Sequence, residues 1–291
     1  MFEKLDACPS CSHRTFTNYK IVDDHFNTQE SFALVSCDNC GLVFTNPRPS
    51  IATIDRYYDS PEYLSHHDRS RSLFQFVYRL LRQIALQRKT RILTSLTRKP
   101  TTILDFGSGP GYLLDHLQRK AWDVQGVEPS DRARSAAPEN VKSSISSSID
   151  AIAGPFEIIT AWHVIEDVHD LHETISQLKN RLAPNGYLVI AVPNICSYDC
   201  EHYDDKWAGY DTPRHLYHFT QDSLKQLFIN HQFTFIRTIP LLFDAYYVSL
   251  LSERYTHSRY PWFKALMSGF KSNKLARSTS EFSSIIYIFQ K

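Results

Sequence analysis

The chain has 291 residues, of which 42% are hydrophobic and 22% charged, and its formal net charge is +1. These proportions are typical of a soluble globular protein that buries a substantial core, and the near-zero charge argues against a protein coated in nucleic acid. No apolar run approaches the roughly 18 residues that cross a bilayer, and the N-terminus lacks the apolar core of a secretory signal, so we expect a cytoplasmic location and no membrane insertion.

Four cysteines near the start of the chain form two Cys-x-x-Cys pairs. Cys8 and Cys11 lie in CPSC, and Cys37 and Cys40 lie in CDNC. In a chain without a secretory signal such pairs favour one tetrahedral Zn²⁺ over disulfides, and four thiolates leave no open coordination position for a substrate. The intervening segments TFTNYKIVDDHF and ESFALVSC are expected to be strands. We therefore predict a zinc ribbon over residues 1–50 with a structural metal.

Residues 51–99 are expected to form a linker and a basic amphipathic helix. NPRPSI ends the ribbon with prolines, and a long helix is expected from about Ser72 to Thr97. Its apolar stripe repeats at helical spacing: Leu73, Val77, Leu80, Leu81 and Ile84. From 69 to 99 there are nine Lys or Arg and no Asp or Glu, which leaves 23 basic and 31 acidic residues elsewhere, a net charge of −8. The helix is therefore a solvated face, a surface for phosphates, a partner for acidic groups in the rest of the chain or, as a less favoured alternative, a membrane-surface helix.

Strands and helices alternate over residues 100–291. TTILDF, WDVQGVE, FEIITAW, YLVIAVP, FTFIRTI and SSIIYIFQK predict strands, and GYLLDHLQRK, LHETISQLKNRL and QDSLKQLFINH predict helices between them. This alternation predicts an α/β fold with a mostly parallel sheet and helices on both faces. Ligands bind such sheets beyond the carboxyl ends of the strands.

The first of these strands ends in ILDFGSGPGYLL. Gly107, Gly109 and Gly111 let a ligand approach the backbone and the start of the next helix. A dinucleotide site uses G-x-G-x-x-G, whereas the third glycine of that pattern is replaced here by Tyr112. Asp105 would repel a pyrophosphate but suits a ligand with ammonium and sulfonium charges. The loop therefore favours S-adenosylmethionine (SAM) over NAD.

The second strand ends at Glu128. Its two carboxylate oxygens can accept hydrogen bonds from both hydroxyls of a ribose. This placement suits an adenosine-containing ligand beside the glycine loop.

With these landmarks the chain resembles class I SAM-dependent methyltransferases over nearly its whole length, and in particular bacterial members with an N-terminal zinc-binding segment. The matching stretches are LDFGSGPG, VQGVEPS, FEIITAWHVIEDV and LKNRLAPNGYLVIAVPN, preceded by CGLVFTNPRP and followed by WAGYDTPRHLYHFT. The resemblance implies a Rossmann-like sheet and places these residues around the methionine part of SAM: Asp105, Gly107, Ser108, Gly109 and Gly111. It also implies Glu128 at the ribose and Ser144 or Ile145 near the adenine. One departure is Asp167, where relatives commonly carry histidine.

Methyl transfer requires an aligned nucleophile, exclusion of water and, for some acceptors, removal of a proton. His163 follows the fourth strand and is expected over the cofactor's methyl group. It would act there as a general base, or would orient the substrate or bond the backbone. Glu166 is expected to brace the same loop.

The stretch KWAGYDTPRHLYHF (206–219) combines aromatic, acidic, basic and imidazole groups. Asp211, Arg214 and His215 are candidates to bind or deprotonate a polar substrate, with Tyr210 and Trp207 as walls of its site. The alternative is that Asp211 and Arg214 form an ion pair that fixes the loop.

Residues 239–282 are longer than a connection between two strands requires. They contain two amphipathic, aromatic segments, which predict a lid over the substrate or a dimer surface. No ligand is assigned to them.

Three functions are compatible with these features. The first is methylation of an oxygen, nitrogen or carbon of a small biosynthetic intermediate, such as a sugar or glycan precursor. The second is RNA methylation, with the ribbon and basic helix bound to phosphates, and the third is a SAM-binding scaffold without turnover. The acidic remainder of the chain disfavours RNA, and intact Asp105, Glu128 and His163 disfavour a scaffold.

Overall fold

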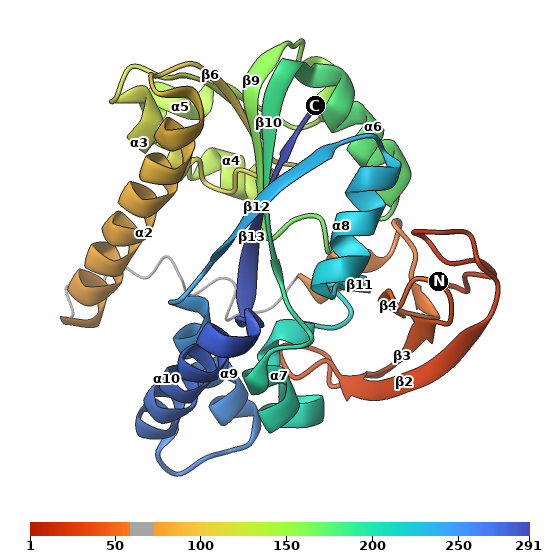
Figure 1. The fold of residues 1–291 in the computed structure, drawn as a ribbon. Coiled ribbons are helices and arrows are strands. Elements are labelled where there is room, and N and C mark those ends of the chain that lie inside the picture. Colours follow the sequence, from red (N-terminus) through yellow and green to blue (C-terminus); the bar gives the residue numbers. More distant parts are fainter. Residues whose placement is uncertain (59–72) are drawn as a thin grey trace. The chain divides into compact units, whose positions relative to one another are not determined.

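The computed structural model describes residues 1–58 and 73–291, with side chains for 1–58 and 82–291 (Figure 1). The chain divides into two compact units. The first unit contains Met1–Tyr63, His163–Ile175 and Ile190–Ile288, and the second contains Leu64–Trp162, Ser176–Val189 and Phe289–Lys291. No helix in the described part of the chain is long and apolar enough to cross a membrane.

The main sheet is mixed and mostly parallel, and its seven strands follow the order β12-β13-β10-β9-β6-β7-β8. Their bounds are β6 Thr102–Phe106, β7 Asp123–Val127, β8 Ile145–Ser146, β9 Phe156–Trp162, β10 Leu182–Pro193, β12 Thr234–Pro240 and β13 Ser284–Gln290. β6 pairs in parallel with β7 and β9, so Asp105 lies opposite Gly126 on one side and Thr160 on the other. The predicted α/β sheet is confirmed.

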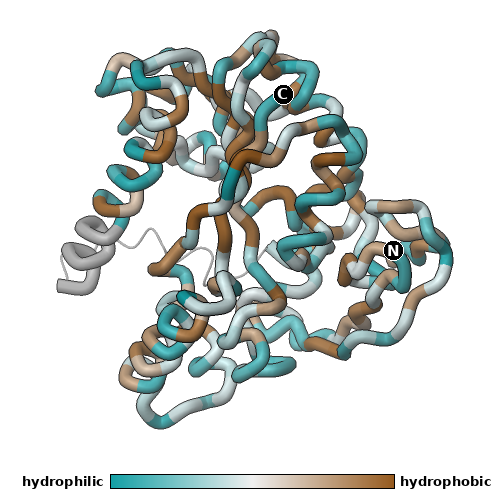
Figure 2. The backbone as a smooth tube through the Cα atoms, viewed as in Figure 1, coloured by the Kyte–Doolittle hydropathy of each residue, from teal (hydrophilic) through white to brown (hydrophobic). Residues whose placement is uncertain are grey.

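The centre of the second unit is apolar along successive residues rather than alternate ones. Ile103 and Leu104 on β6 and Ile158 and Ile159 on β9 are all fully buried, and these strands appear brown in Figure 2. Burial of both strand faces is typical of a parallel sheet covered on both sides. The unit's helices are α2 Leu73–Thr97, α3 Tyr112–Gln118, α4 Asp131–Ser135, α5 Glu139–Lys142 and the 3₁₀ turn η2 Ile149–Ala151.

The helix expected from Ser72 is α2, and Ile84, the one residue of the predicted stripe among the described side chains, lies outside its buried face. Ile84 is exposed, whereas Leu86, Thr90 and Leu93 are buried. These three residues lie at helical spacing on one face of α2. This face packs against the rest of the unit, and Ile84 lies on another face. The other four residues of the predicted stripe lie outside the described side chains.

A small four-stranded antiparallel sheet in the first unit carries the cysteine pairs. Its order is β11-β4-β3-β2, with β2 Phe16–Asp23, β3 Ser31–Cys37, β4 Val43–Thr45 and β11 Tyr217–His218. Two short strands, β1 Phe2–Glu3 and β5 Arg48–Pro49, pair beside it, and η1 Ile54–Tyr57 follows. β11 belongs to the 206–219 loop, so this loop completes the ribbon's sheet.

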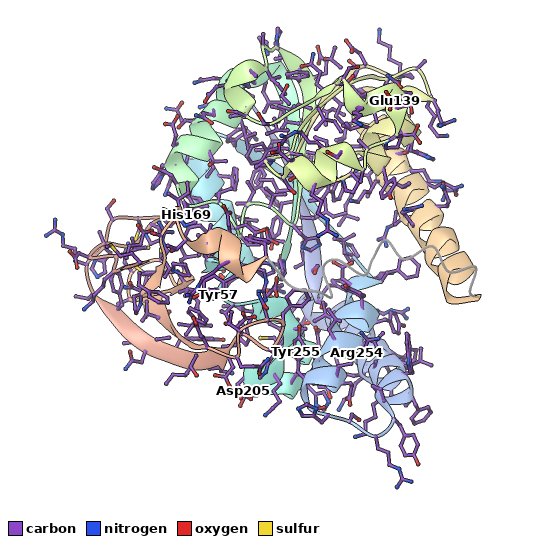
Figure 3. All side chains as sticks on the ribbon, turned by 180° about the vertical axis from the view of Figure 1, so that it is seen from behind. Tyr57, Glu139, His169, Asp205, Arg254 and Tyr255 are labelled. Carbon is purple, nitrogen blue, oxygen red and sulfur yellow. The ribbon has the colours of Figure 1, made fainter. Side chains whose placement is uncertain are left out.

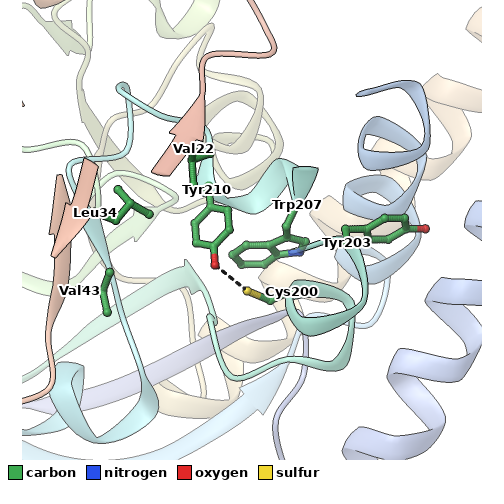
Figure 4. Close-up of a cluster of buried hydrophobic side chains, with 7 residues drawn as sticks. All are labelled: Val22, Leu34, Val43, Cys200, Tyr203, Trp207 and Tyr210. Atoms are coloured by element: carbon green, nitrogen blue, oxygen red, sulfur yellow. Dashed lines mark hydrogen bonds between the residues drawn. The ribbon is translucent and has the colours of Figure 1, made fainter. Parts of the chain in front are cut away.

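The ribbon and the 206–219 loop also share a buried cluster, drawn in Figure 4. Its members are Val22, Leu34, Val43, Cys200, Tyr203, Trp207 and Tyr210. The Cys200 thiol lies 3.4 Å from the Tyr210 hydroxyl inside it. The remaining helices of the first unit are α7 Tyr198–Tyr203, η3 Asp204–Lys206, η4 Ala208–Tyr210, α8 Gln221–Asn230, α9 Asp244–Tyr255 and α10 Pro261–Thr279, while α6 Leu171–Arg181 begins in this unit and ends in the other.

Candidate functional site

The glycine loop joins the carboxyl end of β6 to α3 in left-handed backbone. Gly107, Gly109 and Gly111 have φ of 75°, 53° and 71°, which side chains rarely adopt. A Cβ at Gly111 would also lie 2.8 Å from Cδ1 of Ile145, whereas the described residues place no atom within 4 Å of a Cβ at Gly109. Gly109 therefore presents its backbone to open space, where a ligand can approach it.

Glu128 connects this loop to the end of β7. Its Oε2 accepts a hydrogen bond from the Gly109 amide at 2.9 Å, and its Oε1 accepts one from the Ser130 amide at 2.9 Å. A carboxylate has about four acceptor positions, so each oxygen retains one for a ligand hydroxyl. The Ser108 hydroxyl is buried and has no hydrogen-bond partner among the described residues. These groups fit the ribose and the polar end of SAM.

Asp105 is a buried carboxylate in the middle of the second unit. It accepts a hydrogen bond from the Thr160 hydroxyl at 2.5 Å and is only 3% exposed. Burial raises the pKa of Asp105 to about 6, although the Thr160 hydrogen bond and the Lys89 charge act in the opposite direction. At neutral pH the group is therefore an anion with little solvent around it, which suits a cationic ligand.

Two cations of α2 lie over aromatic rings of the same unit. Lys89 Nζ is 4.0 Å from the centroid of the Trp162 ring, and Arg82 Cζ is 4.0 Å from that of Tyr112. The Trp162 indole nitrogen is buried without a hydrogen bond within the described chain. Sequence reasoning missed Trp162 and Lys89. The position of Trp162 directly before His163 was the one available signal.

The two residues predicted near the adenine lie at β8. The Ser144 carbonyl accepts a hydrogen bond from the Gly126 amide at 2.9 Å, and Ile145 is buried beside Gly111. Ile145 therefore adjoins the glycine loop, and Ser144 adjoins β7, both within the second unit.

His163 lies between two carboxylates in the first unit, with a left-handed φ of 55°. Its Nδ1 is 3.2 Å from Glu166 Oε1, and its Nε2 is 3.1 Å from Asp244 Oδ2. Burial alone would lower the pKa of His163, but the hydrogen bonds to Asp244 and Glu166 raise it to about 10. The side chain is therefore an imidazolium that donates both of its protons, and it has no lone pair for a substrate proton while both contacts hold.

His215 has a different environment. Its Nδ1 is 3.0 Å from the Gly209 carbonyl, to which only a protonated nitrogen can donate. Its Nε2 lies 3.8 Å from Asp167 Oδ1 and 4.0 Å from Asp211 Oδ2. Burial and the neighbouring Glu166 charge raise the pKa of Asp167. His215, a predicted catalytic group, thus lies among acidic side chains. Its Nδ1 bonds to the Gly209 carbonyl, whereas its Nε2 makes no hydrogen bond to a described residue.

Arg214 and Asp211 form the ion pair that was the alternative to a substrate role, with Arg214 Nη2 2.7 Å from Asp211 Oδ1. The same guanidinium donates to Asp24 at 3.0 Å and to the Tyr57 carbonyl at 2.9 Å. Burial opposes ionisation of Asp211, but the charge of Arg214 and its hydrogen bonds to this carboxylate lower its pKa. Tyr210 is fully buried in the cluster of Figure 4. Asp24, on the ribbon, is a partner that the sequence did not indicate.

The four cysteines converge on one point of the ribbon. Sγ of Cys8 is 3.6 Å from Sγ of Cys40, Sγ of Cys11 is 3.6 Å from Sγ of Cys37, and all four sulfurs lie within 4.8 Å of one another. A tetrahedral zinc with Zn–S bonds of about 2.3 Å requires sulfurs about 3.8 Å apart. The Asn39 amide also donates to Cys11 Sγ at 3.5 Å, as groups around thiolate ligands do. The donor set fits a structural zinc.

One protein-family model matches the chain, and solved structures share its fold. The family model described as "Methyltransferase domain" matches residues 66–238. Magnesium protoporphyrin IX methyltransferase from Synechocystis PCC 6803, solved with S-adenosylhomocysteine (SAH), is 12% identical; the match covers 83% of this chain and 100% of that one, with a TM-score of 0.53. The 1,6-didemethyltoxoflavin-N1-methyltransferase of Burkholderia thailandensis, also solved with SAH, is 14% identical over 94% of this chain and 98% of that one, with a TM-score of 0.51. No curated protein matches the sequence.

Proposed function

Since the chain belongs to the methyltransferase-domain family and is a class I SAM-dependent methyltransferase, we propose that it methylates an oxygen, nitrogen or carbon nucleophile of a small biosynthetic intermediate, such as a sugar or glycan precursor. The observation that carries this proposal is the pairing of a buried anion, Asp105, with the ribose-type acceptor Glu128 around an open glycine loop. The two structures compared above are named as methyltransferases of magnesium protoporphyrin IX and of 1,6-didemethyltoxoflavin, and such non-polymeric acceptors support a small acceptor here.

Different residues of the second unit would bind different parts of the cofactor. Asp105 and the loop from Gly107 to Gly111, with Ser108, would hold the methionine end, Glu128 the ribose, and Ser144 or Ile145 the adenine side. When bound, SAM supplies a methyl carbon activated by a sulfonium, and its departure as a neutral thioether needs no acid catalyst. The chain must therefore position the acceptor, exclude water and, where the nucleophile carries a proton, accept that proton.

We assign the proton acceptor to His215 and a positioning role to His163. His163 already holds two protons between Glu166 and Asp244, so it fixes the loop after β9. His215 can take a proton at Nε2, and the imidazolium so formed faces the Asp211 carboxylate, which stabilises its charge. Arg214 keeps Asp211 ionised and joins the loop to the ribbon.

The basic helix α2 gives no separate support to an RNA substrate. Its residues Arg82 and Lys89 lie over aromatic rings of their own unit. Because Arg82 and Lys89 are engaged in this way, fewer of the nine Lys and Arg residues between 69 and 99 are available to bind phosphates.

Substitution His215→Ala should lower kcat by roughly 100-fold or more, because general-base catalysis contributes about that much, while SAH affinity stays unchanged. SAH release from SAM would be measured with a panel of sugar, phenol and amine acceptors, and affinity by calorimetry. His202→Ala, an exposed histidine of α7, is the matched control. A parallel loss of SAH affinity in His215→Ala would instead indicate a structural role.

The affinity for SAH should depend on pH through Asp105. The pKa of this group in the folded protein is about 6, so it is ionised above that value and attracts the ammonium group of SAH. Below pH 6 it becomes protonated and the attraction is lost, so affinity should fall by up to about tenfold per pH unit. Titrations between pH 8 and 5 measure this, with Asp105→Asn as the variant expected to be independent of pH. A wild-type profile that is equally flat would contradict the assignment.

A further inference from the structure

Helix α10 has its large apolar side chains on the outside. Five of them are more than half exposed: Trp262, Phe263, Leu266, Met267 and Phe270. The buried residues of the helix are small: Ala265, Ser268, Gly269, Ser272 and Ala276. At about 100° per residue the two sets occupy opposite faces of the helix. This pattern is the reverse of an ordinary amphipathic helix, which buries its large apolar side chains.

The orientation of α10 is fixed by its inner face. A Cβ at Gly269 would lie 2.6 Å from Tyr246 Cδ1, so α10 and α9 approach closely there. Ser272 donates a hydrogen bond at 2.7 Å to Asp199, a fully buried carboxylate. Asp199 also accepts from Trp207 Nε1 at 2.8 Å and from Ser283 at 2.6 Å. Rotation of α10 would leave a buried charge short of donors, so the aromatic side remains outward.

The turn before α9 and the first turn of α9 lie beside α10, because the Asn273 side chain donates a hydrogen bond to the Leu242 carbonyl at 2.9 Å. Phe243 and Tyr247 are each at least half exposed, and Leu242 precedes them in the chain. We call this set, together with the five exposed residues of α10, the α9–α10 apolar face. Contiguous exposed apolar surface on a folded chain marks a site of interaction.

Positive charge accompanies this face. From 256 to 280 the chain has five Lys or Arg and no Asp or Glu: Arg259, Lys264, Lys271, Lys274 and Arg277. Arg254, labelled in Figure 3 at the end of α9, lies 5.9 Å from the ring centroid of Trp262. The acidic residues of α9 face other groups, because Glu253 is buried against the Tyr203 hydroxyl and Asp244 bonds to His163. On α10 the exposed Lys264 and Lys274 lie near the apolar face at helical spacing, whereas Lys271 Nζ lies 4.6 Å from the ring centroid of Tyr198 on α7.

We propose that the α9–α10 apolar face docks on the surface of an anionic phospholipid bilayer. The aromatic and aliphatic side chains would enter the boundary between headgroups and acyl chains, and the surrounding lysines and arginines would contact lipid phosphates. A second copy of the chain fits less well, because a twofold contact through this face would bring like charges together. Docking of this kind needs no spanning helix.

Flotation of the full chain with vesicles tests the proposal. We expect binding to vesicles of phosphatidylcholine with phosphatidylglycerol, weak binding to phosphatidylcholine alone, release by salt, and a blue shift of Trp262 emission on binding. The double variants Phe263→Ser/Phe270→Ser and Lys264→Gln/Lys274→Gln should each lower the partition coefficient by roughly tenfold or more. Ile21→Ser, an exposed apolar residue of the ribbon, is the control and should bind as the wild type does.

Three outcomes would overturn the proposal. One is the absence of binding to either kind of vesicle. Another is binding that the apolar double variant retains in full while its melting temperature matches the wild type. The third is a wild-type dimer in sedimentation that this variant converts to a monomer without any lipid binding, which would assign the face to a second copy. None of these measurements depends on turnover, so they remain separate from the proposed methyl acceptor.

Discussion

Substitution Cys37→Ser is expected to abolish zinc binding and to unfold the ribbon. Cys37 is a buried member of the four-cysteine cluster at the end of β3, and removing one thiolate would leave a zinc bound there incompletely coordinated. In small zinc domains the metal contributes about 10–16 kcal/mol of folding free energy, so its loss exceeds what the short strands of this ribbon can offset.

The effect should extend beyond the ribbon. β11 pairs with β4, and Asp24 binds Arg214, so the loop that carries His215 loses its support with the ribbon. We expect one zinc per chain in the wild type and none in Cys37→Ser by elemental analysis, with a melting temperature lower by roughly 10 °C or more.

The control for this substitution is Cys196→Ser, which changes an exposed thiol outside the cluster and should retain both zinc and stability. Wild-type protein purified without chelator that contains no zinc would contradict the metal assignment. So would a Cys37→Ser protein that melts as the wild type does.

Substitution Glu128→Ala is expected to weaken SAH binding by roughly 100-fold or more. The substitution removes the acceptor for the ribose hydroxyls and also the acceptor of the Gly109 and Ser130 amides, which hold the glycine loop. Hydrogen bonds to a charged group contribute about 1.5–3 kcal/mol each, which accounts for an effect of this size.

Calorimetric titration with SAH measures the change. Glu139→Ala, an exposed carboxylate at the start of α5 that is labelled in Figure 3, should bind SAH as the wild type does. An unchanged affinity in Glu128→Ala would exclude this carboxylate from the ribose site.

Local sequence patterns predicted the parts of the molecule that local physics determines. Alternating apolar strands and helices predicted the sheet, and the glycines after β6 predicted left-handed backbone at 107, 109 and 111. The spacing of the cysteines predicted a four-sulfur cluster, which the structure contains. In each case the signal lies within a few consecutive residues, or within two short stretches that share the pattern Cys-x-x-Cys.

Contacts between distant segments were not predictable in this way. Asp24 and Arg214 are 190 residues apart, and no periodicity indicates that they meet. The same is true of β11 joining the ribbon and of Asp244 reaching His163. Tyr210, which the sequence suggested as a wall of the substrate site, is buried together with ribbon residues, a contact that no local pattern indicates.

Helix α10 shows a further limit of pattern reasoning. An aromatic stripe at helical spacing is ordinarily the buried face of a helix, and the segment was expected to be a lid or a dimer surface. Here the small residues are buried instead, because Gly269 and Ser272 fit closely against α9 and Asp199. Which stripe is buried depends on partners that a single helix does not specify.

The most direct test of the cofactor assignment is calorimetric titration of the wild-type chain and of Asp105→Ala with SAH and with NADH. The buried anion and the glycine loop predict that SAH binds the wild type, that NADH does not, and that Asp105→Ala loses SAH binding. Binding of NADH in place of SAH would contradict the assignment of the loop to SAM.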